Sequence, residues 1–210
     1  WAVKPKHCGN GGLTMWDKRY AEPGYLFGTE PALFLTREAG VLPQAVRVLC
    51  LADGEGRNSV WLAGLGHQVT AMEASPVALA KARALATARD VTVDFQQSNI
   101  EDWDWHRQFD AVVGVFIQFA PPQTRSAIHA GIAQAVVPGG LVMLHGYAPR
   151  QISYGTGGPS RAENMYELSG LAADFPDWVV LRATDYDADL AEGSRHVGKS
   201  ALIDFIARKP

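Results

Sequence analysis

Cysteine is scarce in this chain, with only Cys8 and Cys50 among 210 residues. Two cysteines placed so far apart do not make the disulfide framework of a small secreted domain. Long apolar runs are also missing, because no stretch reaches the roughly 18 residues that a membrane-spanning helix needs. We therefore expect a cytoplasmic protein that does not cross a membrane.

Clusters of basic residues are missing as well. The chain has 19 lysines and arginines against 22 acidic residues, and its formal net charge is -3. A nucleic-acid-binding surface is usually strongly basic, so we expect a small-molecule substrate and neither a nucleic acid nor a membrane as partner. The neighbours His7 and Cys8 stand alone, and we expect no metal site. The oligomeric state cannot be read from these features.

The length and composition predict one domain with a sizeable core. The chain is 47% hydrophobic and 20% charged, which is ordinary for a globular protein. Residues 1–14 are rich in glycine and lysine and differ in composition from the rest of the chain. We expect them to be a non-native or disordered leader, with Met15 as the natural start and a single domain over residues 15–210.

The most informative stretch runs from Val46 to Ser75. An apolar run over residues 46–51 predicts a buried strand, and a glycine-rich turn comes directly after it. A helical pattern and a second strand come next, and this strand ends at Glu73. A right-handed βαβ unit brings the turn and Glu73 to neighbouring strand ends, where open α/β sheets bind ligands.

Glu73 is expected to hold a ribose. Its carboxylate can accept two hydrogen bonds from a ribose diol, and it lies 17 residues after Gly56, close to the roughly 20 typical of nucleotide sites. Gly54 and Gly56 lack a β-carbon, so a ligand can approach the turn closely. The alternative is a simple tight turn with a solvated Glu73.

The third glycine of a dinucleotide-binding turn is missing, since Ser59 occupies its position. Asp53 and Glu55 add negative charge where a pyrophosphate would lie. A ligand with a cationic sulfonium and no phosphate suits an acidic turn better, which favours S-adenosylmethionine. A nicotinamide-dependent oxidoreductase and a non-catalytic S-adenosylmethionine-binding protein remain the alternatives.

Several motifs resemble the class I methyltransferases of the tellurite-resistance and thiopurine methyltransferase type. They are the GEGRN turn at 54–58, the segment WDKRY…YLFGTEP, YGTGGP at 154–159 and EGSRHVG at 192–198. The resemblance implies a Rossmann-like α/β/α sandwich with seven strands in the order 3-2-1-4-5-7-6, strand 7 being antiparallel. Two departures from the family pattern are Cys50, where an acid is usual, and Ala52, where the first glycine is usual.

The resemblance also implies a set of cofactor-binding residues. The set comprises Ala52, Gly54, Gly56, Arg57, Asn58, Glu73, Ala74, Ser98, Asn99, Ile100, Val115, Phe116 and Tyr25. Asn99 stands where an aspartate usually reads the adenine, and it is alternatively a turn residue. Tyr20, Tyr25 or Phe27 either contacts the sulfonium or packs on the core.

The remaining elements are predicted from periodicity and turn residues. We expect helices over 31–39, 76–89, 122–135 and 163–175, and strands over 91–95, 109–116, 141–145, 178–186 and 200–207. Residues 151–159 are expected to form a loop that contacts the substrate, because loops at this sheet edge carry function.

The implied reaction is direct displacement of the methyl group by a small-molecule nucleophile, for which a thiol or a chalcogen oxyanion is the candidate. His196 is the leading candidate for a general base, because the pKa of histidine lies near neutrality; a structural histidine is the alternative. Tyr154 is the second catalytic candidate, and Arg195 is a weaker candidate for substrate contact.

Overall fold

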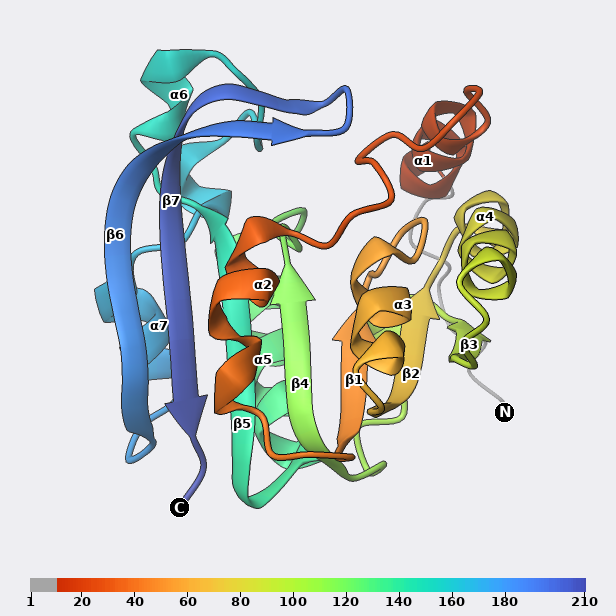
Figure 1. Cartoon of the computed structure of the whole chain (residues 1–210). Helices are drawn as coiled ribbons and strands as arrows, with labels where there is room; N and C mark the ends of the chain where they lie inside the picture. The colour runs from red at the N-terminus through yellow and green to blue at the C-terminus, as the bar shows by residue number, and fades with distance from the viewer. Residues whose placement is uncertain (1–10) are drawn as a thin grey trace, which may run out of the picture.

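The computed structural model describes residues 11–210, which fold around one seven-stranded sheet (Figure 1). The strand order is β3-β2-β1-β4-β5-β7-β6. Strand β7 runs antiparallel to both of its neighbours, and the other pairs are parallel. The predicted topology is therefore confirmed. The strands are β1 (Arg47–Leu51), β2 (Gln68–Glu73), β3 (Asp94–Gln97), β4 (Phe109–Val115), β5 (Val136–Tyr147), β6 (Val179–Glu192) and β7 (His196–Arg208).

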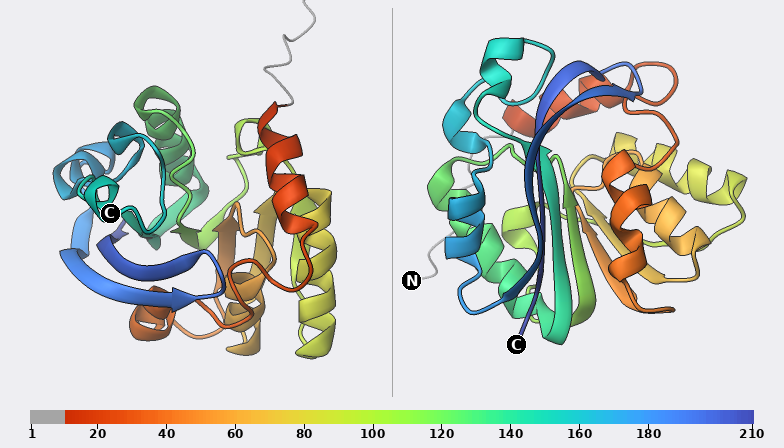
Figure 2. Two further views of the ribbon diagram at one scale, coloured as in Figure 1. Left: turned by 90° about the horizontal axis from the view of Figure 1, so that it is seen from above. Right: turned by 60° about the vertical axis from the view of Figure 1, so that its left-hand side comes forward.

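Helices cover both faces of the sheet, as the two views of Figure 2 show. The helices are α1 (Gly11–Tyr20), α2 (Leu33–Glu38), α3 (Arg57–Gly64), α4 (Pro76–Ala88), α5 (Pro122–Ala135), α6 (Gln151–Tyr154) and α7 (Leu168–Asp174). Three short 3-10 helices add to them: η1 (Ala39–Val41), η2 (Ile100–Asp102) and η3 (Ala162–Asn164). None of the helices in the described part of the chain combines the length and apolar character needed to span a membrane.

The alternation of side chains along the strands builds two cores. In β5, Met143 packs with Leu35 of α2 and Leu62 of α3 on one face. Its neighbours Val142 and Leu144 pack with α5 and α7 on the other face. Strands buried on both faces are nearly continuous apolar runs, and each fully buried aliphatic side chain contributes roughly 1.5–3 kcal/mol. These cores fix the strand ends that carry the site.

Specific residues set the two helices that come after β1 and β2. Ser75 caps α4 by accepting a hydrogen bond from the backbone N–H of Ala78 at 3.3 Å, with Pro76 in the first turn. Gly56 precedes α3 with φ +89°. A β-carbon there would lie 2.7 Å from that of Ala82, so only glycine allows α3 and α4 to pack this closely.

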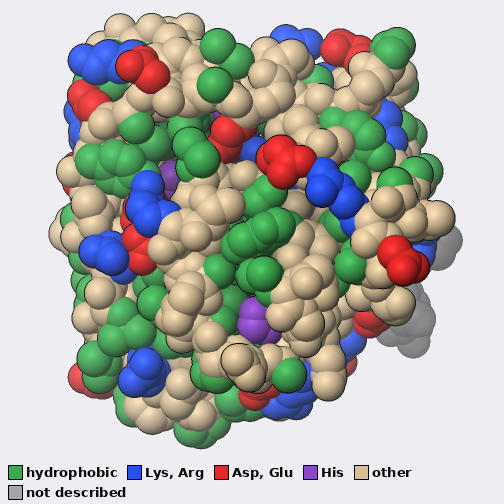
Figure 3. Space-filling view, viewed as in Figure 1, with side chains coloured by type: hydrophobic (Ala, Val, Ile, Leu, Met, Phe, Trp, Pro, Cys, Tyr) green, Lys and Arg blue, Asp and Glu red, His purple; other side chains and the backbone are tan. Residues whose placement is uncertain are grey.

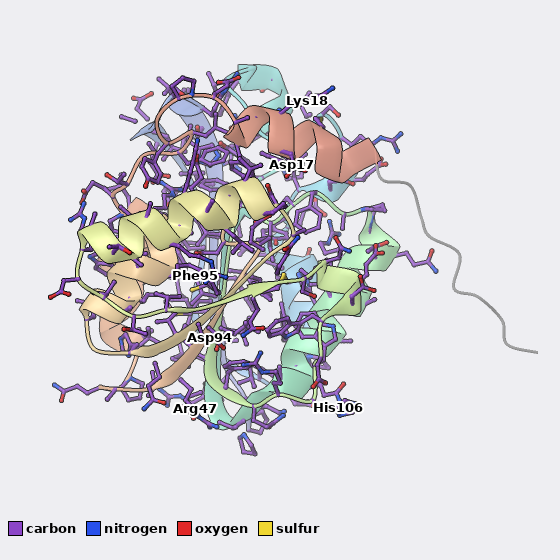
Figure 4. All side chains as sticks on the ribbon, turned by 90° about the vertical axis from the view of Figure 1, so that its right-hand side faces the viewer. Asp17, Lys18, Arg47, Asp94, Phe95 and His106 are labelled. Carbon is purple, nitrogen blue, oxygen red and sulfur yellow. The ribbon has the colours of Figure 1, made fainter. Side chains whose placement is uncertain are left out.

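Helix α1 lies across the start of α4, and Asp17 points toward that helix (Figure 4). The Ser75 hydroxyl donates a hydrogen bond to the Asp17 carboxylate. Residues 1–10 of the expected leader lie outside the described residues, whereas residues 11–14 form the first part of α1. Helix α1 therefore begins before Met15.

Several predicted boundaries were wrong. The strand expected over 141–145 is longer, because β5 runs from Val136 to Tyr147. The expected helix over 163–175 is divided into η3 and α7, and β3 begins at Asp94 instead of Val91. The last two strands are longer than expected and leave a turn of only 193–195 between them. The spacing of apolar residues in the sequence does not show how far the β6–β7 hairpin extends beyond the rest of the sheet.

Candidate active site

The glycine turn and Glu73 meet at the carboxyl ends of β1 and β2, as the βαβ topology requires. One Glu73 oxygen accepts a hydrogen bond from the backbone N–H of Gly54 at 2.9 Å, and the other accepts from Ser75 at 2.8 Å. The side chain is buried, and this burial raises the pKa of Glu73. Each carboxylate oxygen keeps a second lone pair for a ligand hydroxyl.

Tyr20, at the end of α1, lies on the glycine turn. A β-carbon at Gly54 would be 3.0 Å from the Tyr20 hydroxyl. Burial, together with the charges of Glu73 and Glu55, raises the pKa of Tyr20, which keeps its phenol neutral. Tyr25, another predicted cofactor contact, donates a hydrogen bond from its hydroxyl to the carbonyl of Lys81 in α4 at 3.1 Å.

The two acidic residues of the turn point in different directions. Asp53 accepts a hydrogen bond from the Ser59 hydroxyl, and burial raises its pKa to about 7. Glu55 faces away from the turn and binds the backbone N–H of Leu26 at 2.6 Å and the Lys81 ammonium at 2.9 Å. The expectation that both carboxylates face the ligand was therefore wrong for Glu55.

Arg57 and Asn58 hold other chain segments over the start of α3. The Asn58 amide oxygen accepts the backbone N–H of Ala32 at 3.0 Å. The buried Arg57 guanidinium donates to the carbonyl of Phe27 at 3.2 Å and to the Glu192 carboxylate at 2.8 Å. The polar groups of these two predicted cofactor-binding side chains are thus engaged within the protein.

Residues 26–28 and residues 192–196 of the β6–β7 hairpin lie over this end of the sheet, and we call these two segments together the roof. The backbone N–H of Ser194 donates to the carbonyl of Leu26 at 3.0 Å. A β-carbon at Gly193 would lie 2.4 Å from the backbone of Phe27. Figure 1 shows the hairpin curving over the strand ends toward α1.

The predicted adenine-binding residues come directly after β3. Asn99 is exposed and donates from its amide to Asp102 at 2.9 Å, which leaves the amide oxygen free to accept. Ile100 is buried in the core beside Trp103. The backbone N–H of Ser98 donates to the carbonyl of Glu73 at 3.1 Å, and Ala74 is half-buried next to it.

Two non-glycine residues with left-handed backbone mark the ends of β1 and β4. Ala52 has φ +45° and Phe116 has φ +56°, conformations that cost energy and are typical of functional sites. Val115 and Phe116 are half-buried at the end of β4. Ala52 and Phe116 thus lie at the carboxyl ends of two neighbouring strands.

His196 lies in an aromatic cluster at the same edge. Its ring centroid is 4.1 Å from that of Phe116, 4.5 Å from Phe27 and 6.0 Å from Tyr147. His196 is buried, and this burial lowers its pKa below the ordinary value, so the imidazole is neutral near pH 7. The structure thus brings His196 to the carboxyl end of β4.

Tyr154 and Arg195 point elsewhere. The Tyr154 hydroxyl donates to Asp187 of β6 at 2.6 Å, and the Lys199 ammonium lies 4.6 Å from its ring centroid. Arg195 is exposed and donates to Glu22 at 3.4 Å. The loop after Tyr154 does reach the roof, because a β-carbon at Gly157 would lie 3.4 Å from the Arg195 carbonyl.

Sequence reasoning missed Glu192 and Tyr147. Glu192 lies opposite His196 in the β6–β7 pairing, and Tyr147 ends β5. The EGSRHVG motif contains Glu192, but its pairing with His196 depends on a hairpin register that the sequence does not reveal. A separate cavity of about 240 Å³ lies on the opposite face between α5, η3 and α7, lined by Arg125, Tyr166 and Asp174 among others.

The face drawn in Figure 3 carries charges of both signs in alternation, with apolar side chains gathered between α2 and α3. The acidic and basic side chains thus do not form a single continuous field on this face.

Comparisons with known proteins agree with this geometry. Residues 48–140 match the family model described as a methyltransferase domain. Comparison with curated proteins gives no match. The structure from "Conversion of a Disulfide Bond into a Thioacetal Group during Echinomycin Biosynthesis" superimposes with a TM-score of 0.76 at 19% identity, covering 94% of this chain and 91% of that one.

Two further solved structures share the fold. TehB from Haemophilus influenzae has a TM-score of 0.69 at 16% identity, over 94% of this chain and 67% of that chain. The N-methyltransferase NodS from Bradyrhizobium japonicum WM9, in complex with S-adenosyl-L-homocysteine, has a TM-score of 0.68 at 13% identity, over 94% of this chain and 98% of that chain. The matched domain at residues 48–140 and the strand order described above together support a methyltransferase enzyme that uses S-adenosylmethionine.

Proposed function

We propose that the chain methylates a small molecule at a soft nucleophilic atom, a thiol or a chalcogen oxyanion, by direct displacement. S-adenosylmethionine, when bound, supplies an electrophilic methyl group on a cationic sulfur. The residues of the crevice fit this cofactor. A buried carboxylate at Glu73 can accept from a ribose diol, and Gly54, which has no side chain, lets the Tyr20 hydroxyl lie against the turn.

The position of the acceptor can be inferred from the strand order. Glu73 on β2 and Asn99 after β3 would hold the adenosine half, so the methionine half extends toward Ala52 and Phe116 at the ends of β1 and β4. The acceptor then lies beyond, on the β4–β5 side, where Phe116 and His196 pack together. We assign this region to the acceptor.

The aromatic cluster is the observation that supports a soft acceptor. Phe27, Phe116 and Tyr147 surround the neutral imidazole of His196, and the nearby charges of Arg57 and Glu192 neutralise one another. Such surroundings suit attack by a polarisable chalcogen atom better than attack by a strongly hydrated oxygen or nitrogen nucleophile. The structural neighbour from echinomycin biosynthesis concerns conversion of a disulfide into a thioacetal group, which is also chemistry at sulfur.

In this proposal the enzyme acts mainly by proximity and orientation, which can supply about 7–11 kcal/mol of barrier reduction. Glu73 and the glycine turn fix the cofactor, and the roof excludes water from the acceptor region. His196 is the proposed proton acceptor, while Tyr154 and Arg195 stay candidates for contacts at the outer rim. The tellurite-resistance and thiopurine types remain the proposed relatives within the class.

Calorimetry and a product assay together test the proposal. The protein should bind S-adenosylmethionine and show no heat with NAD. Release of S-adenosylhomocysteine should then be measured with tellurite, selenite and 2-mercaptoethanol as acceptors, with serine and ethanolamine as hard controls. Binding of NAD alone would refute the cofactor assignment, and turnover with only the hard acceptors would refute the acceptor class.

A further inference from the structure

Two buried polar atoms of the aromatic cluster lack a hydrogen-bond partner among the described residues. They are Nδ1 of His196 and the hydroxyl of Tyr147. The two residues are 9% and 2% exposed, so both atoms are buried. Buried polar atoms are nearly always paired, and an unpaired one needs an explanation. Nδ1 of His196 faces Glu192, whereas the Tyr147 hydroxyl, on an adjacent ring, has a hydrogen bond left to donate to a polar group of a ligand.

Glu192 is the nearest acceptor to the imidazole. Its Oε2 lies 3.6 Å from Nδ1 of His196, and Arg57 donates to the same oxygen at 2.8 Å. The other oxygen of Glu192 accepts the backbone N–H of Leu33 at 3.0 Å. Burial alone would raise the pKa of Glu192, but the contacts with His196 and Arg57 outweigh it and lower the pKa to about 2. Glu192 is thus a fixed anion beside the ring.

This arrangement determines the orientation of the imidazole. A carboxylate beside Nδ1 favours the tautomer with the proton on Nδ1, which leaves Nε2 without a proton. Nε2 lies on the opposite side of the ring from Glu192 and can accept a proton. The Tyr147 hydroxyl remains protonated because burial raises its pKa, so it can donate a hydrogen bond.

We propose that Tyr147, His196 and Glu192 form the binding site for the S–H group of a thiol acceptor, with Glu192 positioning His196. This inference rests on the proposed function and narrows it from two acceptor classes to one. Nε2 of His196 takes the thiol proton as the sulfur attacks, and the imidazolium is paired with Glu192. The proton then leaves to solvent, which returns His196 to its neutral form. The Tyr147 hydroxyl donates to the sulfur and fixes its position.

The acidity of the acceptor distinguishes the acceptor types. An ordinary thiol has a pKa near ~8.5, so a neutral imidazole can take its proton as the sulfur attacks. An aliphatic alcohol is a much weaker acid, so the same imidazole cannot deprotonate it effectively. A chalcogen oxyanion attacks through a lone pair on the chalcogen and needs no deprotonation, so it makes no use of the His196 base. The site therefore fits a protic thiol best.

The first test uses ¹⁵N-histidine NMR of the full-length protein with S-adenosylhomocysteine bound. The His196 signals, assigned by comparison with His196→Gln, should show the Nδ1-protonated tautomer and a pKa below 6.5. Glu192→Gln should lower that pKa further, because the anion that stabilises the imidazolium is lost. The Nε2-protonated tautomer in the wild type, or a pKa that does not respond to Glu192→Gln, would overturn the positioning role.

The second test measures methyl transfer to 2-mercaptoethanol as a function of pH. Tyr147→Phe should raise KM about tenfold with little change in kcat, as expected for one lost hydrogen bond. His196→Gln should lower kcat about 10²–10⁴-fold at pH 7, and this deficit should disappear above about pH 9, where the thiol ionises unaided. Tyr166→Phe removes a buried hydroxyl on the opposite face of the sheet and is the matched control.

The outcomes separate the two proposals. If S-adenosylmethionine does not bind the wild type, the proposed function fails. If it binds and tellurite or selenite is methylated but 2-mercaptoethanol neither reacts nor perturbs the His196 signals, the thiol site is wrong and the broader function stands. A pH-independent deficit in His196→Gln, or a fall in melting temperature that accounts for the loss in Tyr147→Phe, also overturns the assignment.

Discussion

Replacing Asp53 with asparagine should stabilise the protein without cofactor, and only above acidic pH. Burial raises the pKa of Asp53 to about 7 from an ordinary value of 3.8, and the charge of Glu73 adds to this. Between these two values the folded state keeps a proton that the unfolded state has lost. Stability therefore falls as the pH rises through this window, and the full loss is present above pH 7.

The size of the effect can be worked out from the pKa difference. A pKa difference of about three units corresponds to about 4 kcal/mol of folding free energy for a fully buried group. The Asp53 side chain keeps partial exposure, so solvent reduces the cost, and we expect about 2 kcal/mol. Asparagine retains an oxygen that can accept from the Ser59 hydroxyl. For a chain of this length, ~2 kcal/mol corresponds to a rise in melting temperature of roughly 4–8 °C.

Thermal unfolding of the wild type and Asp53→Asn at pH 4.5, 6 and 8 provides the measurement. The melting temperatures should nearly coincide at pH 4.5 and diverge toward pH 8, with the variant higher. S-adenosylmethionine carries a sulfonium charge that S-adenosylhomocysteine lacks, and a nearby cation lowers a carboxyl pKa. The ratio of their affinities should therefore rise with pH in the wild type and stay flat in the variant. Parallel pH profiles for the two proteins would falsify the buried-carboxyl account.

The other predictions concern the turn, the helix contact and the roof. Glu73→Gln should weaken S-adenosylmethionine binding by about 2 kcal/mol, roughly 30-fold, whereas the exposed Glu101→Gln should change nothing; equal calorimetric affinities for all three proteins would contradict the ribose assignment. Gly56→Ala should destabilise the fold by roughly several kcal/mol, because the φ of Gly56 is +89° and the new β-carbon would meet Ala82. If the variant unfolds at the same denaturant concentration as the wild type, α3 and α4 can move apart without cost. Gly193→Ala should lower the free energy of unfolding more than Gly139→Ala does, because both glycines have positive φ but only Gly193 would place its new β-carbon against Phe27. The backbone strain alone costs about 1–2 kcal/mol in each variant. Equal melting temperatures for the two variants would show that the roof is loosely packed.

The meeting of Glu73 with Gly54 could be predicted from the residues, whereas the strand order was implied by the family resemblance. The apolar runs identify β1 and β2, and a right-handed crossover places their carboxyl ends side by side. The glycine turn and Glu73 are then brought together by the chain topology, independently of side-chain packing elsewhere in the protein. The same topological reasoning delivers His196 to the carboxyl edge of the sheet, where the structure has it against Phe116.

The directions of individual side chains could not be predicted. Glu55 and Asp53 are two residues apart, but only the contacts with Leu26 and Lys81 show that Glu55 faces away. Glu192 pairs with His196 through a turn whose length depends on packing against Phe27. The roof contacts join segments that lie far apart in the chain, and local periodicity carries no information about them.

The roof has a consequence for the order in which the protein is made. Its two parts are residues 26–28, near the beginning of the described chain, and the hairpin at 192–196. During synthesis the glycine turn leaves the ribosome long before strand β7, which lies between β5 and β6 in the sheet. The roof is therefore completed last, and a nascent chain lacks the proposed acceptor region until β7 is inserted.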